Sequence, residues 1–356
     1  MLAAAVAAPA ALAAPLDALL TATPERADPR GRVELGFDKA VGALDFSTSS
    51  DPSGQTPAIT QGDYSGAQMH AAWRATDRLW LSGGLWQRRI HNAVDRFDYR
   101  SWQLAGQYRF NDAAGAVPAF ALRLSGWGNQ ASETAATTPV RVPGAVLNTV
   151  TVADPADRNL QADLVATWPL SSQLDVTGLL SVGSTKLSYG GLTATTSVAG
   201  CNYHLQFTGN DIFGTLIEPC AGSGGAVIRQ FYDSSGDYGV DVAREIAWSG
   251  RFMQFGANAQ WRDGPWSVAG GYLFYTIRRD DVDDILARRG NPVYRHNHQL
   301  MFEAAYKLNP NWSPFARAQI NSNLFFNDIP VTYNASTSSS FGTALSVVTI
   351  GLRGGF

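Results

Sequence analysis

Long stretches of the chain alternate between apolar and polar residues with a period of two. Leu160, Leu164 and Trp168 share one face of such a stretch, opposite Asn159 and Asp163. Successive side chains of a β-strand point to opposite faces, so each stretch predicts a strand with one apolar and one polar face. The pattern recurs along most of the chain and predicts an all-β protein.

The last residues of the chain show the same alternation. Ile350, Leu352 and Phe356 lie on one face, and Thr349 and Arg353 lie on the other. An amphipathic strand that stops on an aromatic residue is unusual at the end of a soluble domain. It is typical of a strand that closes a membrane barrel against the first strand.

Five short polar turns join neighbouring strands, and an aromatic residue stands before each of them. Asp, Asn, Gly and Pro fill these turns, as tight antiparallel hairpins require. Trp and Tyr gather at the bilayer interface in transmembrane barrels. We therefore expect a girdle at the periplasmic rim, with chance aromatics in the hairpins of a soluble β-structure as the alternative. The expected girdle comprises Trp73, Tyr108, Trp168, Trp261, Tyr306 and Phe356.

The connections at the other ends of the strands are longer and rich in Ser, Thr, Gly, Asp and Pro. Five short turns and six long connections join twelve strands, and this asymmetry is that of outer-membrane barrels. The long connections are expected at about residues 49–61, 92–95, 131–156, 190–235, 280–292 and 328–340.

Together these features resemble the Gram-negative outer-membrane β-barrels over residues 31–356, without pointing to a subfamily. The resemblance implies an integral outer-membrane, antiparallel up-and-down barrel of about twelve strands, with short periplasmic turns and long extracellular loops. It also implies outer-membrane lipid and lipopolysaccharide as surroundings, and insertion by the barrel-assembly machinery, which reads the last strand. Gly354 departs from the pattern, since many members carry a bulkier apolar residue there.

Composition agrees with a barrel. Charged residues make up 16% of the chain, and no run of eighteen apolar residues follows the N-terminus. The net charge of −3, with scattered Lys and Arg, gives no sign of nucleic-acid binding. Residues 1–14 are expected to be a signal peptide that lacks its basic start, or alternatively an Ala-rich helix that stays attached. Residues 15–30 are expected to be a flexible leader.

Cys201 and Cys220 are the two cysteines, and both lie in the least periodic stretch of the chain. An even pair in an exported protein predicts a disulfide, here within the fourth long loop. This loop contains apolar residues, so it could fold into the barrel as a constriction or outward as a partner-binding surface. The sequence leaves both open.

The polar faces of the strands carry charges of both signs, which are expected to line the lumen. They allow two functions: a narrow channel for passive diffusion of small polar solutes, or a non-conducting barrel whose extracellular loops mediate surface binding or adhesion. A twelve-stranded barrel lies between side-chain-filled barrels and open porins, so both remain possible. The lumen-lining candidates are Glu34, Asp38, Arg74, Arg88, Arg109, Arg123, Asp163, Asp175, Glu303, Lys307, Arg317 and Arg353.

No enzyme, cofactor or metal site is expected. His296 and His298 share a strand face, but a third metal ligand is missing nearby. Residues 278–290 combine four Asp with flanking arginines, which predicts a short solvated helix with charge pairs. Alternatively, its arginines touch lipopolysaccharide phosphates directly. These arginines are Arg278, Arg279, Arg288 and Arg289.

Overall fold

A computed structural model places most of the chain, apart from the first residues and several loop segments. The expected signal peptide lies outside the described residues, and only residues 18–23 and 30 of the expected leader are described. The structure describes residues 18–23, 30–42, 44–45, 61–92, 95–137, 139–142, 145–217, 220, 228–238, 240–324, 327–335 and 337–356.

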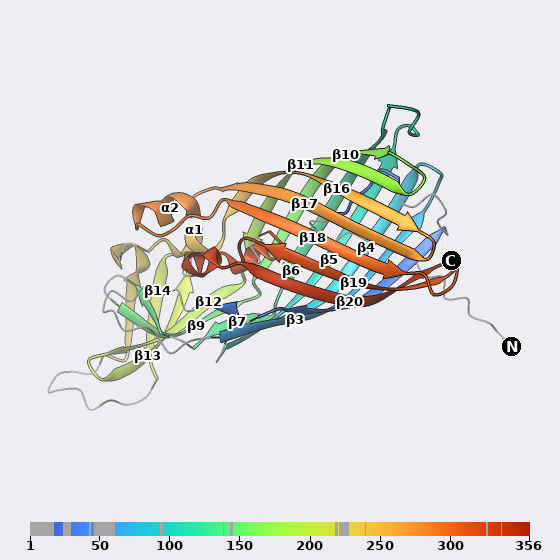
Figure 1. Ribbon diagram of the computed structural model, residues 1–356. Coiled ribbons are helices and arrows are strands. Elements are labelled where there is room, and N and C mark those ends of the chain that lie inside the picture. The colour runs from blue at the N-terminus through green and yellow to red at the C-terminus, as the bar shows by residue number, and fades with distance from the viewer. Residues whose placement is uncertain are drawn as a thin grey trace.

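Twelve antiparallel strands form a closed barrel, which confirms the predicted number (Figure 1). They are β1 (Gly31–Ala40), β3 (Gln61–Arg74), β4 (Leu79–Asn92), β5 (Asp95–Arg109), β6 (Ala119–Gln130), β10 (Ala156–Pro169), β11 (Leu174–Ser188), β16 (Ser249–Asp263), β17 (Trp266–Arg279), β18 (His296–Tyr306), β19 (Trp312–Asn321) and β20 (Leu345–Gly355). The short strand β2 (Leu44–Asp45) extends the pairing beside β3.

The first and last strands close the cylinder. Strand β1 pairs with β20 from Arg32↔Gly355 to Ala40↔Val347, and with β3 along its other edge. A closed sheet has no unpaired edge, so the strand backbones find their hydrogen-bond partners within the wall. The two chain segments furthest apart in sequence thereby complete the barrel.

Each wall strand presents apolar side chains outward and polar side chains inward. In β10, Leu160 is 68% exposed and Leu164 is 46% exposed, whereas Asp157, Asn159 and Asp163 are buried. Exposed leucines between buried carboxylates and amides invert the arrangement of a soluble domain. This polarity is the one that a wall in contact with lipid requires.

Short turns and long connections lie at opposite ends of the barrel, as predicted. The turn between β16 and β17 leaves only two residues between the strands, and Gly264 there adopts φ +55°, a conformation that favours glycine. Following the usual asymmetry of such barrels, we assign the short turns to the periplasmic side. Figure 1 shows the C-terminus at this end and the helices α1 and α2 at the other.

Two of the long connections form a second sheet beyond the barrel, which the sequence did not reveal. It projects from the extracellular end in Figure 1, and the disulfide between Cys201 and Cys220 lies within it. Tyr203, Leu205 and Ile212 form its small core. Its strands are β7 (Glu133–Ala136), β8 (Val140–Val142), β9 (Ala145–Ala153), β12 (Gly191–Val198), β13 (Cys201–Thr208), β14 (Asp211–Leu216) and β15 (Gln230–Ser234).

The helical segments are short and all lie in extracellular connections. A helix, α2, lies between β17 and β18 as predicted, and an ion pair of 3.2 Å joins Asp283 within it to Arg279. The expectation that it is solvated was wrong, because Ile285 and Leu286 are buried against the rest of the protein. None of the helices in the described part of the chain is long and apolar enough to cross a membrane. The segments are η1 (Ser235–Tyr238), α1 (Val242–Ile246), α2 (Val282–Arg288), η2 (Pro330–Thr332) and η3 (Ser338–Gly342).

Candidate functional site: the barrel lumen

Four charged side chains meet on the inner wall where the barrel closes. Arg353 Nη2 lies 2.9 Å from Glu34 Oε2 and 2.8 Å from Glu303 Oε1. Arg317 Nη2 lies 3.1 Å from Glu34 Oε1 and 2.6 Å from Glu303 Oε2. Acids and bases thus alternate around a quartet contributed by β1, β18, β19 and β20, and their formal charges cancel.

A second ion pair lies on strands β6 and β10. Arg123 Nη1 is 3.1 Å from Asp163 Oδ2, and both side chains are almost fully buried. The amide of Gln161 donates to the other oxygen of Asp163, and Gln254 Nε2 donates to Gln161 Oε1 at 2.9 Å. The inner wall therefore neutralises its charges locally, which reduces the cost of holding them away from bulk water.

Residues 18–23, which belong to the segment expected to be a flexible leader, lie inside the barrel. Wall side chains donate to three successive carbonyl oxygens: Gln260 to Leu19 at 2.9 Å, Asn258 to Leu20 at 2.7 Å and Gln107 to Thr21 at 2.9 Å. These donors lie in the periplasmic half of their strands. The segment therefore occupies the periplasmic part of the lumen.

The wall makes room for this segment. Ala18 and Ala22 are almost completely buried, and the backbone N–H of Ala22 donates to Thr167 Oγ1 at 2.8 Å. A Cβ added to Gly271 would collide with the carbonyl oxygen of Ala18, so only glycine allows this close approach. The residues that contact the segment therefore come from the inward faces of β5, β10, β16 and β17.

The connection between β19 and β20 folds into the extracellular part of the lumen. The backbone oxygen of Asp328 accepts hydrogen bonds from Asn129 Nδ2 at 3.1 Å and Arg88 Nη1 at 3.4 Å. The backbone N–H of Val331 donates to Asp157 Oδ2 at 3.0 Å. Strands β4, β6 and β10 therefore hold this inward loop, which we define as the described residues 327–335 and 337–344.

Apolar packing adds to these hydrogen bonds. Ile329 and Tyr333 of the inward loop are fully buried, and Phe341 is nearly so. The guanidinium carbon of Arg279 lies 3.7 Å from the centre of the Tyr333 ring, and Trp248 Nε1 donates to the Tyr333 carbonyl at 2.8 Å. The inward loop thus closes the extracellular mouth with a packed core.

The carboxyl group of Asp328 has a perturbed pKa. Burial in the mouth of the barrel raises its pKa above the ordinary range, and the carboxylate of Asp38 acts in the same direction. The charge of Arg88 and the hydrogen bond from Gln319 oppose this shift. Docking of the inward loop therefore favours the protonated form of this side chain.

The predicted lumen residues divide by depth. Arg88, Arg123, Asp163, Glu303 and Arg317 lie on the inner wall, as described above. Three others lie at the periplasmic end: Arg74 beside the Trp80 ring, Arg109 bonded to the Asp77 carbonyl at 2.9 Å, and Lys307 exposed just after β18. These three are not brought into the ion-pair clusters.

The predicted girdle residues lie on the outer face near the short turns. Trp73, Tyr108, Trp261 and Phe356 are each at least 40% exposed, and Tyr306 is 37% exposed. Tyr306 packs against Trp266 with ring centres 4.8 Å apart. Trp168 lies on the same face of β10 as Leu164 and Leu160.

Sequence reasoning identified neither element that occupies the lumen. The disulfide-containing loop was the candidate plug, but it forms part of the second sheet outside the barrel. Asn129 and Asp157, which hold the inward loop, were not singled out. The sequence signal that could have revealed the inward loop is the apolar content of residues 324–341, where Leu324, Ile329 and Tyr333 interrupt a polar stretch.

Metal binding has no support in the described part of the chain, where no group of three or more His, Cys, Asp or Glu side chains is placed to hold an ion. His298 Nδ1 instead lies 2.8 Å from the hydroxyl of Tyr272 on the outer wall.

Comparisons with known proteins give likeness of shape only. The sequence matches no protein-family model and no curated protein. The structure is similar to the translocator domain of the autotransporter NalP from Neisseria meningitidis, at 10% identity and a TM-score of 0.48, covering 91% of this chain and 88% of that one. It is also similar to the KdgM porin, at 8% identity and a TM-score of 0.39, covering 91% and 99% of the two chains. The toluene transporter TbuX of Ralstonia pickettii gives 10% identity, a TM-score of 0.39, and coverage of 91% and 89%.

The decisive observation is the closed sheet with leucines outside and charges inside. The chain folds as a transmembrane β-barrel. Its lumen is polar, lined by neutralised ion pairs, and occupied at one end by residues 18–23 and at the other by the inward loop.

Proposed function

We propose that this barrel is a narrow channel for passive diffusion of small polar solutes. The observation that supports the proposal is a set of buried polar atoms on the inner wall that no described residue satisfies. They include Gln103 Nε2, Ser125 Oγ, Ser181 Oγ and both amide atoms of Gln299. An unsatisfied polar group away from water costs several kcal/mol, so these groups favour a hydrated lumen.

The two elements in the lumen set the aperture of the proposed channel. Residues 18–23 are held mainly through their backbone carbonyls, and such hydrogen bonds are readily exchanged for bonds to water. If the predicted signal peptide is removed, this segment lies close to a free chain end. Its withdrawal would open the periplasmic half without any change in the wall.

Conductance across a planar bilayer tests this proposal. Replacing Gln107, Asn258 and Gln260 with Ala removes the donors to the N-terminal segment and is expected to raise single-channel conductance. The exposed amide Gln173, in a periplasmic turn, provides the matched control as Gln173→Ala. If neither the folded wild type nor the triple variant produces current steps, the proposal of a channel is wrong.

A second function is favoured by the second sheet. Tyr232 is 70% exposed, Ile228 is 59% exposed and Ile217 is 49% exposed, all on a polypeptide that projects from the extracellular end. Such residues suit a surface that binds a partner, with the barrel acting as a non-conducting anchor. This function would be favoured if the protein gives no current across a bilayer and if adhesion is lost when Tyr232 and Ile228 are changed to Ser.

A further inference from the structure

Four cationic side chains form a continuous patch on the outer wall near the extracellular rim. They are exposed, and they occupy four adjacent strands: Arg158 on β10, Lys186 on β11, Arg251 on β16 and Arg278 on β17. Arg158 is paired directly opposite Lys186, and Arg251 directly opposite Arg278. Arg251 is paired with Ser184, which places it diagonally from Lys186. We call these four residues the cationic patch.

The patch is electrostatically unfavourable as it stands. Like charges directly opposite each other across two strands destabilise a sheet. Among the described residues, no ion pair or hydrogen bond involves the side chain of any of the four. Two adjacent repulsive pairs therefore face outward, and no described carboxylate is paired with any of the four residues. An anionic ligand would turn this repulsion into attraction.

The depth of the patch places it among lipid headgroups. Arg158 precedes Trp168 by ten positions on β10, and Arg251 precedes Trp261 by ten positions on β16. Ten residues of a strand span about 33 Å, and a tilt of about 40° reduces this to about 25 Å along the membrane normal. That is about the height of the apolar band, so the patch lies at the outer interface when these Trp residues lie at the inner one.

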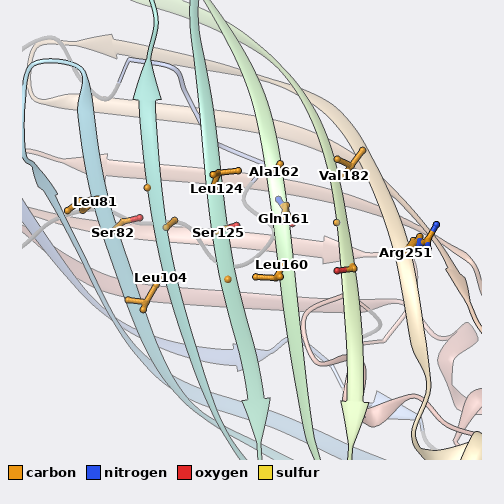
Figure 2. A pocket seen from close by; sticks show the side chains of 15 residues that line it. Leu81, Ser82, Leu104, Leu124, Ser125, Leu160, Gln161, Ala162, Val182 and Arg251 are labelled. Carbon is orange, nitrogen blue, oxygen red and sulfur yellow. The ribbon is translucent and has the colours of Figure 1, made fainter.

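An apolar groove runs along the wall directly beside the patch. It has a volume of about 880 Å³, and Arg251 lies at one edge of it (Figure 2). Ser184 also lines it. Its sides are leucines and a valine of neighbouring strands, and glycines form its floor. Gly106 lies between Leu81 and Leu124 across the strands, and Gly126 lies between Leu104 and Leu160.

We propose that the cationic patch and the groove together bind one lipid of the outer leaflet that carries both phosphate and acyl chains, of the lipopolysaccharide type. The phosphates contact the four cations, and an acyl chain lies in the groove. Arg and Lys are the side chains best suited to phosphate oxygens, and each contributes to attraction at a charged lipid surface. The proposal does not depend on whether the lumen conducts.

The site differs from the arginine group expected from the loop sequence. Arg279 is buried in an ion pair with Asp283, and Arg289 is paired with Glu245. Of those four arginines only Arg278 belongs to the patch. Strand register, not proximity in sequence, brings the other three cations to it.

The test is a titration of the lipid-stripped, detergent-solubilised barrel with bisphosphorylated lipid A, with bound lipid counted by native mass spectrometry. We expect one tightly bound lipid on the wild type. Changing all four patch residues to Gln should weaken binding on the order of a thousandfold. The control changes four exposed cations elsewhere, Arg30, Arg78, Arg244 and Lys307, to Gln and should leave binding unchanged.

The groove is tested separately with Gly106→Leu and Gly126→Leu. An added Cβ at either position meets only leucine side chains and backbone at ordinary contact distances of 3.5 Å or more, so the barrel should still fold. We expect weaker lipid binding with the cationic patch intact. Heat-modifiable migration on gels verifies that each variant is folded.

Several outcomes would overturn the proposal. If the patch variant and the control variant weaken lipid binding equally, the binding reflects general charge attraction and not a specific site. Full competition by inorganic phosphate would make the ligand a free anion and not a lipid. Unchanged binding after the glycine substitutions would show that no acyl chain lies in the groove. If the wild type is a dimer and the glycine variants are monomers, the groove binds a second copy of the chain and not a lipid.

Discussion

Asp157 on the wall and Val331 in the inward loop are joined by a hydrogen bond of 3.0 Å from the Val331 backbone N–H to Asp157 Oδ2. Asn129 and Asn159 orient the same carboxylate through their amide groups, at 3.0 Å and 2.7 Å. This wall carboxylate is therefore one of the contacts that hold the loop in the extracellular mouth, beside the bonds from Arg88 and Asn129 to the Asp328 carbonyl.

Asp157→Ala should release the inward loop and raise single-channel conductance, because the Val331 N–H then loses its acceptor. Asp157→Asn retains an acceptor oxygen and should behave more like the wild type. Asp175→Ala is the matched control, since Asp175 pairs with Arg262 at 2.8 Å near the periplasmic end. Identical currents in Asp157→Ala and wild type would show that the loop does not depend on this bond.

Acid should strengthen docking of the inward loop. Burial raises the pKa of Asp328 in the docked loop above its value in a free loop. Docking therefore takes up a proton, is favoured at low pH and weakens as the pH rises through the raised pKa. Conductance should be lower at pH 4 than at pH 7, and Asp328→Asn should flatten this dependence. Arg88 stays charged throughout this range, so an unaltered pH profile in Asp328→Asn would assign the effect to another carboxyl group.

Glu34→Gln should destabilise the closed barrel. Arg317 and Arg353 would then share Glu303 as their one carboxylate in the quartet, and a buried charge that loses its partner costs about 3 kcal/mol or more. The unfolding midpoint in a heat-modifiability assay should fall. Asp63→Asn is the control, because Asp63 pairs with Lys39 at an exposed site. Such an exposed ion pair contributes less than about 1 kcal/mol to stability. Equal midpoints for the two variants would argue against a stabilising quartet.

Breaking the disulfide should affect the second sheet and leave the lumen unchanged. The Cα atoms of Cys201 and Cys220 are 5.2 Å apart, within the sheet that projects beyond the barrel. Cys201→Ser with Cys220→Ser should leave conductance unchanged, while trypsin cleavage after Arg229 becomes faster because the sheet opens more often. A clear rise in conductance would show instead that this loop restricts the pore.

The sequence by itself determined the wall. Period-two alternation is a local property of each strand, and turn residues such as Asp263 and Gly264 mark where each hairpin reverses. Twelve strands, their order and the side that faces lipid follow from these local signals, because an up-and-down barrel pairs each strand with its neighbour in sequence. The closing pair of β1 and β20 was foreseen from the terminal Phe356 and its apolar face.

Only the tertiary structure decided what fills the lumen and what the outer wall presents. The bond between Val331 and Asp157 joins residues 174 positions apart, and that between Asn258 and Leu20 joins residues 238 apart. Neither has a periodic signature, since a loop docks by matching hydrogen bonds to a surface that exists only once the barrel is closed. Arg158 and Lys186 likewise become neighbours only through strand register. Local alternation specifies the cylinder, and contacts distant in sequence specify its contents.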